Sequence, residues 1–373
     1  MTGRLAVFAV EDTAAQVCWA DLPEGATVEA GDATVTVPAG GGPGAATLAG
    51  LPVASELDLL LRAPGGARRR VGRFRTLAPP PGNLLCRFAT VNDLHIGERR
   101  FGVLRRIREE PRPDRDPYPT RCAGAALAEA VEWGAEVVLA KGDLTYMGRP
   151  AQWDEVGRML AAVPVPVDAT LGNHDVGRRA VDGREALGRH GIDLVDGAGA
   201  RDLPGVRAVL ADTSVPRQSG GRVGDELRQR IADLLASAPG PVFLAMHHYP
   251  QRFQFPTAYP RGIPGDNARA LLDVVATANP ATLVATGHSH RNRKHRHGPL
   301  VVVEIGATMH YPGTWAGYAV HEGGIRQVVR RVAAPHAIEW TERTRRALLG
   351  LWGPWAAGTL RQRCFSHHWP TPR

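Results

Sequence analysis

Residues 137–148, VVLAKGDLTYMG, carry the pattern on which the fold assignment rests. The run begins with four apolar residues, two of them β-branched, which is typical of a strand buried in a sheet. Lys141 and Gly142 follow, and then the carboxylate of Asp143. No helix pattern starts at this acid, so helix capping does not explain it. Its place at the end of a buried strand suggests that it binds a ligand.

The same arrangement recurs along the middle of the chain. Strand-like apolar runs occupy residues 84–93, 135–143, 164–173, 207–213, 241–248 and 281–288. Helix-like stretches separate them at 123–134, 151–163, 224–238 and 265–278. This alternation predicts an α/β fold built around a largely parallel sheet. Two final strand-like segments, 298–306 and 317–332, favour antiparallel pairing.

The two ends of the chain have different compositions. Residues 1–80 read as short alternating strands between Gly/Pro turns and resemble a small fibronectin-type-III-like β-sandwich with Trp19 in its core. The Pro-rich linker APPPGN at 78–83 separates them from a predicted catalytic domain at 84–335. Residues 336–373 are predicted to form a helical, aromatic extension. We expect it to cover the core; contact with a second subunit in a homodimer and a membrane-surface role are the alternatives.

The charge of the chain does not favour a nucleic-acid partner. The 373 residues include 45 basic and 37 acidic side chains, for a net charge of +8. Such an excess would ordinarily suggest an anionic partner. Lysine occurs only at positions 141 and 294, however, and the abundance of Arg, Ala, Gly and Pro indicates a GC-rich coding bias. We therefore interpret the excess as a dispersed, solvated surface.

The cysteines and the apolar runs suggest a cytoplasmic protein. Four cysteines are scattered along the chain without a CxxC pair, and we expect them to be reduced thiols. The N-terminus does not have the pattern of a signal peptide. No apolar run reaches the roughly 18 residues that a membrane-spanning helix needs.

Side chains that commonly bind metals follow the predicted strands. They are Asp93, His95, Asp143, Asn173, His174, His247, His288 and His290. Because the carboxyl ends of strands in an open α/β sheet line one crevice, we expect these side chains to converge. Carboxylates, imidazoles and one amide suit ions such as Mn, Fe, Zn or Co. There are too many for one ion with an open position, and they suit two ions about 3.5–4 Å apart.

Five short motifs resemble the calcineurin-like metallophosphoesterase family over about residues 86–325. They are DLH at 93–95, GD at 142–143, GNHD at 172–175, HH at 247–248 and GHSH at 287–290. The resemblance implies a four-layer αββα sandwich with a site for two divalent or mixed-valence ions at one sheet edge. Position by position, it implies that Asp93, His95 and His290 bind the first metal. It further implies that Asn173, His247 and His288 bind the second, with Asp143 bridging both.

The resemblance also implies a catalytic role for His174. In the family the histidine of this motif faces the substrate and assists the leaving oxygen. An imidazole beside two cations can hydrogen-bond a phosphoryl oxygen and protonate an alkoxide. The nucleophile would be a hydroxide held between the metals, attacking phosphorus in line.

Tyr146 separates two branches of the family. The motif GDLTY at 142–146 resembles purple acid phosphatases, in which this tyrosine binds a ferric ion. Those enzymes lack a histidine in the first motif, however, and here His95 is present. Class III cyclic nucleotide phosphodiesterases resemble the chain better in DLH, in HH followed by proline and in GHSHRNR, but they have an aspartate at the position of Tyr146. Whether Tyr146 orients His174, contacts a metal or packs beside the site stays open.

Three single residues and two loops are candidates for substrate contact. His248, Tyr146 and Asn292 are the candidate substrate-binding residues. The loop 249–267 carries Tyr249, Phe253, Phe255 and Tyr259, which suit base stacking or loop packing. The insertion after His95 carries arginines that suit either a phosphate clamp or a solvated loop. The rest of the basic segment 290–298 is interpreted as a solvated turn.

The sequence therefore predicts a dimetal phosphoester hydrolase, with a phosphodiesterase acting on a cyclic nucleotide or a similar small diester as the favoured reading. A phosphomonoesterase acting on a small metabolite is the main alternative. A scaffold that keeps the fold without catalysis is the alternative from a different class of protein.

Overall fold

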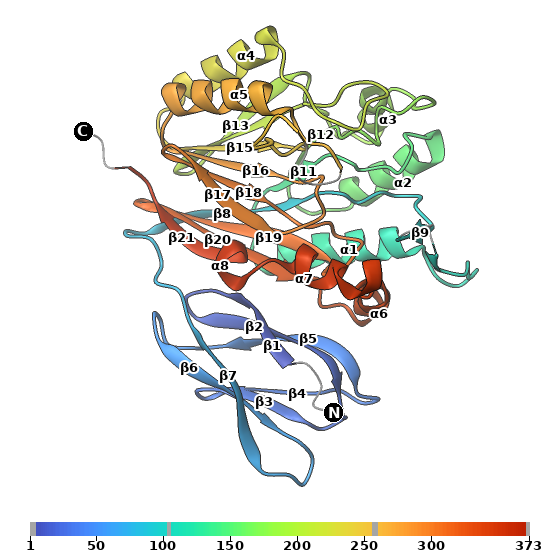
Figure 1. The fold of residues 1–373 in the computed structure, drawn as a ribbon, viewed down its shortest axis with the longest axis vertical. Coiled ribbons are helices and arrows are strands. Elements are labelled where there is room, and N and C mark those ends of the chain that lie inside the picture. Colours follow the sequence, from blue (N-terminus) through green and yellow to red (C-terminus); the bar gives the residue numbers. More distant parts are fainter. Residues whose placement is uncertain (1–4, 103–105, 256–259, 371–373) are drawn as a thin grey trace.

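The computed structural model describes residues 5–102, 106–255 and 260–370. Two six-stranded sheets lie face to face in its centre, with helices on both outer faces (Figure 1). A separate group of antiparallel strands from the N-terminus lies below them in this view. The α/β fold and its four layers are thus confirmed.

The first central sheet has the order β12-β11-β8-β19-β20-β21. Its strands are β8 (Leu84–Val91), β11 (Val138–Lys141), β12 (Val167–Thr170), β19 (Thr314–His321), β20 (Gly324–Arg331) and β21 (Cys364–His368). The strands β8, β11 and β12 are parallel, whereas β19, β20 and β21 continue the sheet in antiparallel pairs. The carboxyl ends of β8, β11 and β12 therefore meet at one edge.

The second central sheet has the order β13-β14-β15-β16-β18-β17. Its strands are β13 (Ala198–Leu203), β14 (Val206–Ala211), β15 (Val242–Met246), β16 (Thr282–Thr286), β17 (Arg293–His297) and β18 (Leu300–Glu304). The four inner strands are parallel and the two edge strands are antiparallel. Phe88 of the first sheet meets Phe243 of the second, with ring centroids 4.8 Å apart, in the apolar layer between the sheets.

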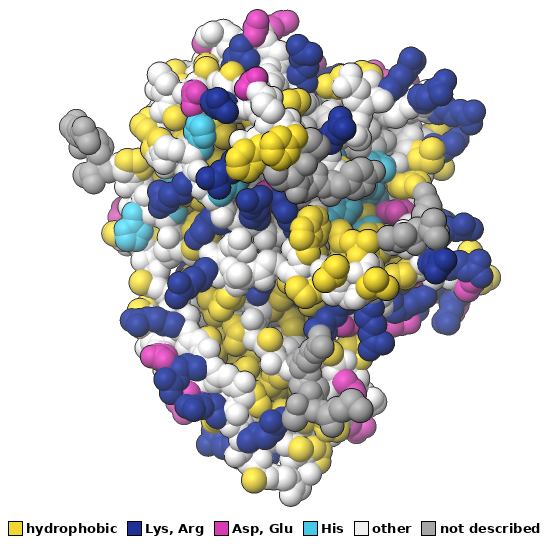
Figure 2. All heavy atoms as spheres, in the orientation of Figure 1, with side chains coloured by type: hydrophobic (Ala, Val, Ile, Leu, Met, Phe, Trp, Pro, Cys, Tyr) yellow, Lys and Arg dark blue, Asp and Glu magenta, His cyan; other side chains and the backbone are white. Residues whose placement is uncertain are grey.

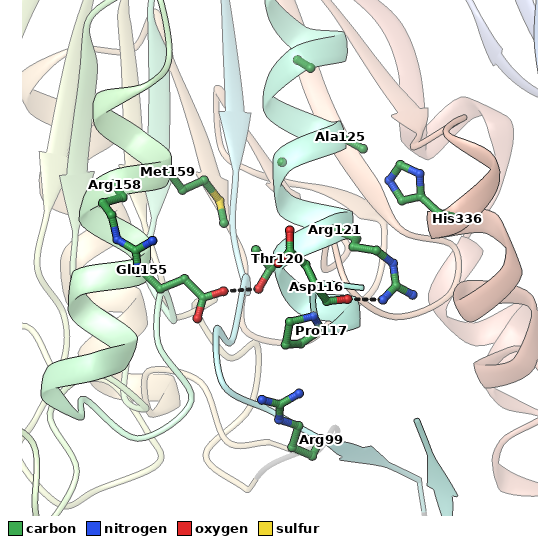
Figure 3. A pocket seen from close by; sticks show the side chains of 12 residues that line it. Arg99, Asp116, Pro117, Thr120, Arg121, Ala125, Glu155, Arg158, Met159 and His336 are labelled. Carbon is green, nitrogen blue, oxygen red and sulfur yellow. Dashed lines mark hydrogen bonds between the residues drawn. The ribbon is translucent and has the colours of Figure 1, made fainter. Parts of the chain in front are cut away.

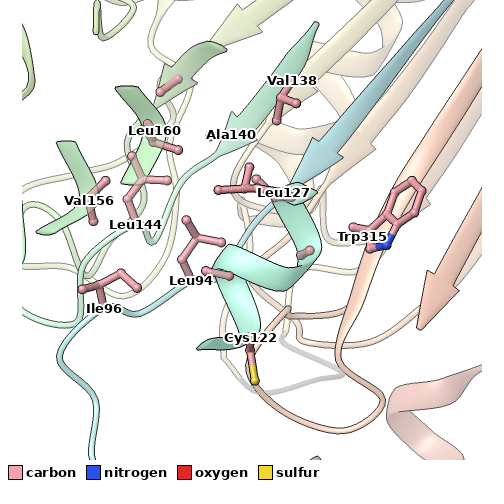
Figure 4. Packing of buried hydrophobic residues seen from close by; sticks show 14 of the residues in the cluster. Leu94, Ile96, Cys122, Leu127, Val138, Ala140, Leu144, Val156, Leu160 and Trp315 are labelled. Atoms are coloured by element: carbon pink, nitrogen blue, oxygen red, sulfur yellow. The ribbon is translucent and has the colours of Figure 1, made fainter. Parts of the chain in front are cut away.

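Helices cover both outer faces. The helices α1 (Tyr118–Glu132), α2 (Pro150–Ala161), α3 (Gly183–Gly188) and α6 (Pro335–Thr344) belong to the side of the first sheet, and α4 (Asp225–Ala236) and α5 (Gly265–Ala278) cover the second. Figure 4 shows Leu127 of α1 and Leu160 of α2 beside Val138 of β11. Apolar residues three or four positions apart place one face of each helix on the sheet.

Seven antiparallel strands form the N-terminal region. One sheet contains β1 (Leu5–Val10), β2 (Ala14–Leu22) and β5 (Gly42–Ala49). The other contains β3 (Thr27–Ala30), β4 (Ala33–Thr36), β6 (Glu56–Arg62) and β7 (Arg68–Arg75). Trp19 is buried in their shared apolar core. The predicted β-rich region is present, and the fibronectin-type-III likeness and the domain boundaries stay predictions.

The N-terminal region packs against β20 through polar contacts as well as apolar ones. Gln16 accepts a hydrogen bond from the backbone N–H of Arg331 (2.8 Å) and donates one to its carbonyl (2.8 Å). Glu11 pairs with Arg330 (2.7 Å) and lies 3.5 Å from Arg326. These partners are buried or half-buried, so the β-rich region and the central sheets share one continuous interior.

The C-terminal segment contains helices, as predicted for the helical, aromatic extension, but it also contains a strand that was not predicted. After α6 come a 3₁₀ turn (Leu348–Gly350), α7 (Trp352–Ala357) and α8 (Leu360–Arg363), but the chain then forms β21 along the edge of β20. The open edge of β20 offers backbone partners that override a helical preference there. Trp340 is buried and stacks on Tyr118 with centroids 3.7 Å apart, so this segment covers the core as expected.

Two further expectations at 290–306 are corrected. Residues 293–297 form the edge strand β17 instead of a solvated turn, and β18 lies parallel to β16 as well as antiparallel to β17. The composition of the two strands explains their places in the sheet. The charged sequence RKHRH of β17 suits an edge strand. Every residue of β18 is buried, as is typical of a strand inside a parallel sheet that is covered on both faces. Among the helices of the described ranges, none has both the length and the apolar character to cross a membrane.

Candidate metal centre

The predicted ligands converge at the carboxyl ends of the central strands. They follow β8, β11, β12, β15 and β16, and all are buried or half-buried. Nine non-glycine residues in the described ranges have a positive φ. Five of them belong to this cluster: Asp93, His95, Asp143, His288 and His290. Left-handed backbone at non-glycine residues is costly and concentrates at functional sites, which marks this edge as more than a packing feature.

Glycines beside the acids allow the strand ends to approach one another. Gly142 has φ +80°, and a Cβ at this position would lie 2.7 Å from the carbonyl oxygen of Leu171. A Cβ on Gly172 would lie 2.3 Å from the Asp143 carboxylate. Any larger residue at 172 would therefore displace Asp143 from the cluster.

Asp93, His95 and His290 form one half of the cluster. A nitrogen or oxygen atom from each lies within 4.8 Å of the others. His290 Nε2 is 3.2 Å from Asp93 Oδ1, and His95 Nε2 is 3.7 Å from the same oxygen. The structure thus brings together the three residues expected to share the first metal.

Asp143 lies between the two halves. Its Oδ2 is 3.3 Å from His95 Nε2 and 3.2 Å from His247 Nε2. His247 and His288 belong to a second group of nitrogens within 4.8 Å of one another. The position of Asp143 is the one that a carboxylate bridging two cations requires.

Buried ligand atoms without hydrogen bonds indicate that the cluster fits metal ions. Within the described ranges, six buried side-chain atoms of the site make no hydrogen bond: Asp93 Oδ1, His95 Nδ1 and Nε2, Asn173 Oδ1, His247 Nε2 and His248 Nε2. Each unpaired buried polar atom costs about 1–3 kcal/mol. Nitrogen and oxygen donors without cysteine suit Mn, Fe or Zn. The donor set therefore fits two transition-metal ions.

The pKa shifts of two histidines in the cluster also fit a site for metal ions. Burial would lower the pKa of His247, but Asp143 outweighs it and raises that pKa to about 9. Burial likewise opposes protonation of His95, yet its contact with Asp143 raises the pKa of His95 well above the usual range. Both shifts arise from the negative charge of Asp143, which would equally favour metal ions at this place.

His174 is held beside this centre by backbone groups. Its Nδ1 lies 2.8 Å from the carbonyl oxygen of Tyr146, and its backbone N–H donates to Asp143 Oδ1 at 2.8 Å. The carbonyl makes Nδ1 the donor and leaves Nε2 for other chemistry. Burial lowers the pKa of His174 despite the charge of Asp143. The group that orients His174 is thus the backbone carbonyl of Tyr146.

Asp175 is a site residue that the sequence reasoning missed. Its carboxylate accepts hydrogen bonds from the backbone N–H groups of Leu144 (3.1 Å), Thr145 (2.8 Å) and Gly172 (2.9 Å). It thereby ties the loop after β11 to the loop after β12. Burial and the nearby charge of Asp143 raise the pKa of Asp175 to about 6. Its place in the GNHD motif was the available signal.

A second missed pair lies beneath Asp93. Asn92 Nδ2 donates to Asp93 Oδ2 at 2.6 Å, and Asn92 Oδ1 accepts from Lys141 Nζ at 2.7 Å. Lys141 is buried, and burial lowers its pKa to about 7. Lys141 thus supports Asn92 and, through it, the candidate ligand Asp93. Lysine is rare in this chain, and that rarity was the signal in the sequence that could have pointed to Lys141.

A third missed pair lies behind the first half of the cluster. Glu98 Oε2 is 3.9 Å from His95 Nδ1 and 3.7 Å from His310 Nε2. His310 Nδ1 is in turn 3.4 Å from His290 Nδ1. The ring of Phe101, from the insertion, lies on His310 with centroids 3.7 Å apart. Glu98 therefore lies at ion-pair distance rather than hydrogen-bonding distance from His95, and its charge helps to raise the pKa of that imidazole.

The remaining candidates lie in different surroundings. His248 is buried, with Nδ1 2.9 Å from Thr213 Oγ1, and lies within 4.8 Å of the ligand-type nitrogens of His247 and His288. Asn292 is also buried: it donates to the Ala356 carbonyl (3.2 Å) and accepts from the Gly306 N–H (2.9 Å). These bonds join α7 to the sheet, and they do not support substrate contact by Asn292, which stays a prediction.

The aromatic loop is only partly exposed. Tyr249 is buried and donates to the Pro260 carbonyl at 2.9 Å. Phe253 and Phe255 are 48% and 67% exposed and stack on each other. Tyr259 lies outside the described residues. The exposed rings of Phe253 and Phe255 are therefore accessible for stacking on a nucleobase.

Two cavities differ in their relation to the cluster. A cavity of about 970 Å³ lies between α1 and α2, where Thr120, Glu155 and Arg158 line it with His336 of α6 (Figure 3). No candidate ligand lines it. A cavity of about 740 Å³ is lined by Tyr146, Asn173 and His174. The second cavity is the entrance to the candidate centre.

Comparison with protein families identifies the class. The calcineurin-like phosphoesterase model matches residues 86–292, more than half of the chain, and the chain belongs to this family. It is thus a metallophosphoesterase, a hydrolase of phosphoric esters. The resemblance predicted from the five motifs is confirmed.

Individual relatives are more distant. A probable cyclic nucleotide phosphodiesterase of Synechococcus sp. is 24% identical over 203 residues, 54% of this chain and 72% of the relative. The 3′,5′-cyclic adenosine monophosphate phosphodiesterase CpdA of Pseudomonas aeruginosa is 28% identical over 169 residues, 44% of this chain and 58% of that protein. Among solved structures, PhoD aligns at 12% identity with a TM-score of 0.46, covering 89% of this chain and 87% of that chain.

Proposed function

We propose that the chain is a dimetal-dependent phosphodiesterase that acts on a cyclic nucleotide or a similar small diester. The observation that carries this proposal is the cluster of buried ligand atoms around Asp143, several of them without a hydrogen bond, next to His174 in the lining of a cavity. The cyclic-nucleotide names of two relatives support the diester assignment.

The proposed ligand sets follow the two halves of the cluster. The first ion is assigned to Asp93, His95 and His290; the second is assigned to Asn173, His247 and His288, and Asp143 is shared. Bound transition-metal ions supply Lewis acidity toward water and a phosphoryl oxygen. The strand ends hold the ligand atoms in place before any ion binds, which limits the reorganisation that binding requires.

His174 is the proposed general acid. Its Nδ1–H donates to the Tyr146 carbonyl, which keeps the ring in one orientation and partly offsets the burial that lowers the pKa of His174. Nε2 then holds the proton that passes to the leaving oxygen. Since His174 and Asn173 line the same cavity, the leaving group would lie on the cavity side.

Comparing three substrates tests the proposal. The protein is loaded with Mn, and kcat/KM is measured for bis-p-nitrophenyl phosphate, p-nitrophenyl phosphate and 3′,5′-cyclic AMP. We expect the diesters to be preferred. Preference for the monoester would favour the phosphomonoesterase alternative. Two bound ions without turnover of any of these esters would favour the scaffold.

A cytoplasmic location is part of the proposal. The four cysteines are free and buried in the structure, as expected for thiols of a reducing compartment. A homodimer stays a prediction, to be tested by the mass of the protein in solution.

A further inference from the structure

Four arginines line the cavity that contains Asn173 and His174. They are Arg149, Arg178, Arg179 and Arg217. Met147, Gln218 and Ser219 complete much of the remaining wall, and none of the described lining residues is acidic. The cavity therefore concentrates positive charge immediately outside the candidate metal centre.

These guanidinium groups are available to a ligand. All four side chains belong to exposed residues, and none makes an ion pair within the described ranges. Two arginines of the insertion after His95 show a contrast, because Arg108 pairs with Glu110 and Arg115 pairs with Glu339. Figure 2 shows Lys and Arg side chains gathered at the upper right, over the region of α2 and α3.

Backbone contacts join the loops that carry these arginines. The N–H of Val181 donates to the carbonyl of Gly148 at 2.9 Å, which links the Arg149 loop to the Arg178 loop. The N–H of Arg217 donates to the carbonyl of Val176 at 3.2 Å. The three loops follow β11, β12 and β14, so loops from both central sheets form the wall of the cavity. The arginines thus belong to one connected surface.

We propose that this cavity binds a second phosphate group of the substrate, remote from the phosphorus that is attacked. This inference rests on the proposed function, because it assumes that the scissile ester lies at His174. A guanidinium presents paired N–H donors that match phosphate geometry. A cyclic mononucleotide has no further anion to offer these four groups, so of the two kinds of substrate in the proposed function this inference selects the other, a small diester that is not a cyclic mononucleotide. The substrate class is therefore a small phosphoester that carries an additional phosphate, and about 740 Å³ lies in the range of small-molecule sites.

Binding of inorganic triphosphate to the Mn-loaded full chain provides the first test. Calorimetry compares the wild type with a variant that combines R178Q and R217Q. The matched control combines R69Q and R75Q, which remove two exposed arginines of the N-terminal region. We expect the dissociation constant to rise about tenfold or more in the first variant and to stay within about twofold in the control. Equal affinity of the wild type and the R178Q/R217Q variant would overturn the inference.

A pair of chromogenic diesters provides the second test. Thymidine 5′-p-nitrophenyl phosphate is compared with the same compound carrying a 3′-phosphate. We expect the wild type to prefer the 3′-phosphorylated ester by about tenfold and the R178Q/R217Q variant to lose that preference. Equal kcat/KM values for the two esters in the wild type would contradict the inference and leave the phosphodiesterase proposal intact.

The two tests separate the two proposals. Arginine-dependent binding of triphosphate without hydrolysis of any diester would show an anion site in this cavity, but it would refute the proposed function and with it the assignment of that site to a second phosphate of the substrate. A short single-stranded DNA that binds more tightly than triphosphate, and loses affinity in the R178Q/R217Q variant, would point to nucleic acid and overturn the small-molecule assignment.

Discussion

The two sides of the candidate metal cluster differ in what holds their imidazoles. On the side of His247, backbone carbonyls do so. His247 Nδ1 lies 2.9 Å from the carbonyl oxygen of Lys141, and His288 Nε2 lies 2.9 Å from that of Arg261. Each contact fixes which ring nitrogen faces the centre.

On the side of His95, other side chains stand behind the ligands. Glu98 lies behind His95, and His310 lies behind His290. A substitution can remove a carboxylate or an imidazole but not a carbonyl. Metal binding on the His95 side should therefore be sensitive to substitution of residues behind the ligands, such as Glu98 and His310. Metal binding on the His247 side should respond mainly to substitution of the ligands themselves.

Asp143→Ala should have the largest effect, because Asp143 contacts both sides. We expect loss of both ions and of measurable turnover, since His95 and His247 would lose the carboxylate between them. Metal content per chain is the measurement. Asp273→Ala, at an exposed position on α5, is the control and should keep its ions. Two ions per chain in Asp143→Ala would refute the bridging role.

His174→Ala should leave both metal ions bound while it lowers turnover. We expect a fall of about 10²–10⁴-fold on an alkyl ester, and a smaller one on a p-nitrophenyl ester whose leaving group needs no proton. Metal content and kcat on the two esters are measured together. An equal fall on both esters would argue against the general-acid role.

Glu98→Gln tests the difference between the two sides directly. We expect affinity for one of the two ions to weaken about 10–100-fold, since His95 loses the carboxylate behind it. Stepwise metal titration measures this, with Glu110→Gln in the same insertion as the control. Weakening of both ions to the same extent would show that the two sides do not act separately.

Metal affinity should rise with pH. The pKa of His247 is raised to about 9 by Asp143, so below pH 9 a metal ion must displace a proton from this imidazole. Burial and the charge of His247 lower the pKa of His288 to about 3, so no proton is displaced there. We expect about tenfold tighter binding per pH unit for each proton released between pH 6 and 8. A pH-independent affinity in metal titrations would contradict this.

Tyr146→Phe should have the smallest effect. His174 bonds the carbonyl of Tyr146, which the substitution retains. We expect kcat to change by less than about tenfold, the range of one neutral hydrogen bond. A loss comparable to that of His174→Ala would show instead that the phenol itself takes part in catalysis.

The sequence alone determined the strand-end residues of the site. Asp93, Asp143 and His288 each follow an apolar run, and parallel strands bring their carboxyl ends to one edge whatever the loops between them do. The α/β fold follows from the same alternation of apolar runs and helices, whereas the four layers were implied by the resemblance of the five motifs to the calcineurin-like metallophosphoesterase family. Local pattern and global arrangement agree here, which is why these predictions succeeded.

Only the tertiary structure decided what surrounds those residues. Glu98 lies 3.7 Å from His310, and Arg178 and Arg217 line one cavity, although these residues belong to loops that are far apart in sequence and carry no periodic signal. Likewise, a histidine pattern does not reveal that a carbonyl of Tyr146 holds His174. Strand periodicity is a local property and can be read from the chain, whereas contacts between loops depend on where the packed sheets place their ends.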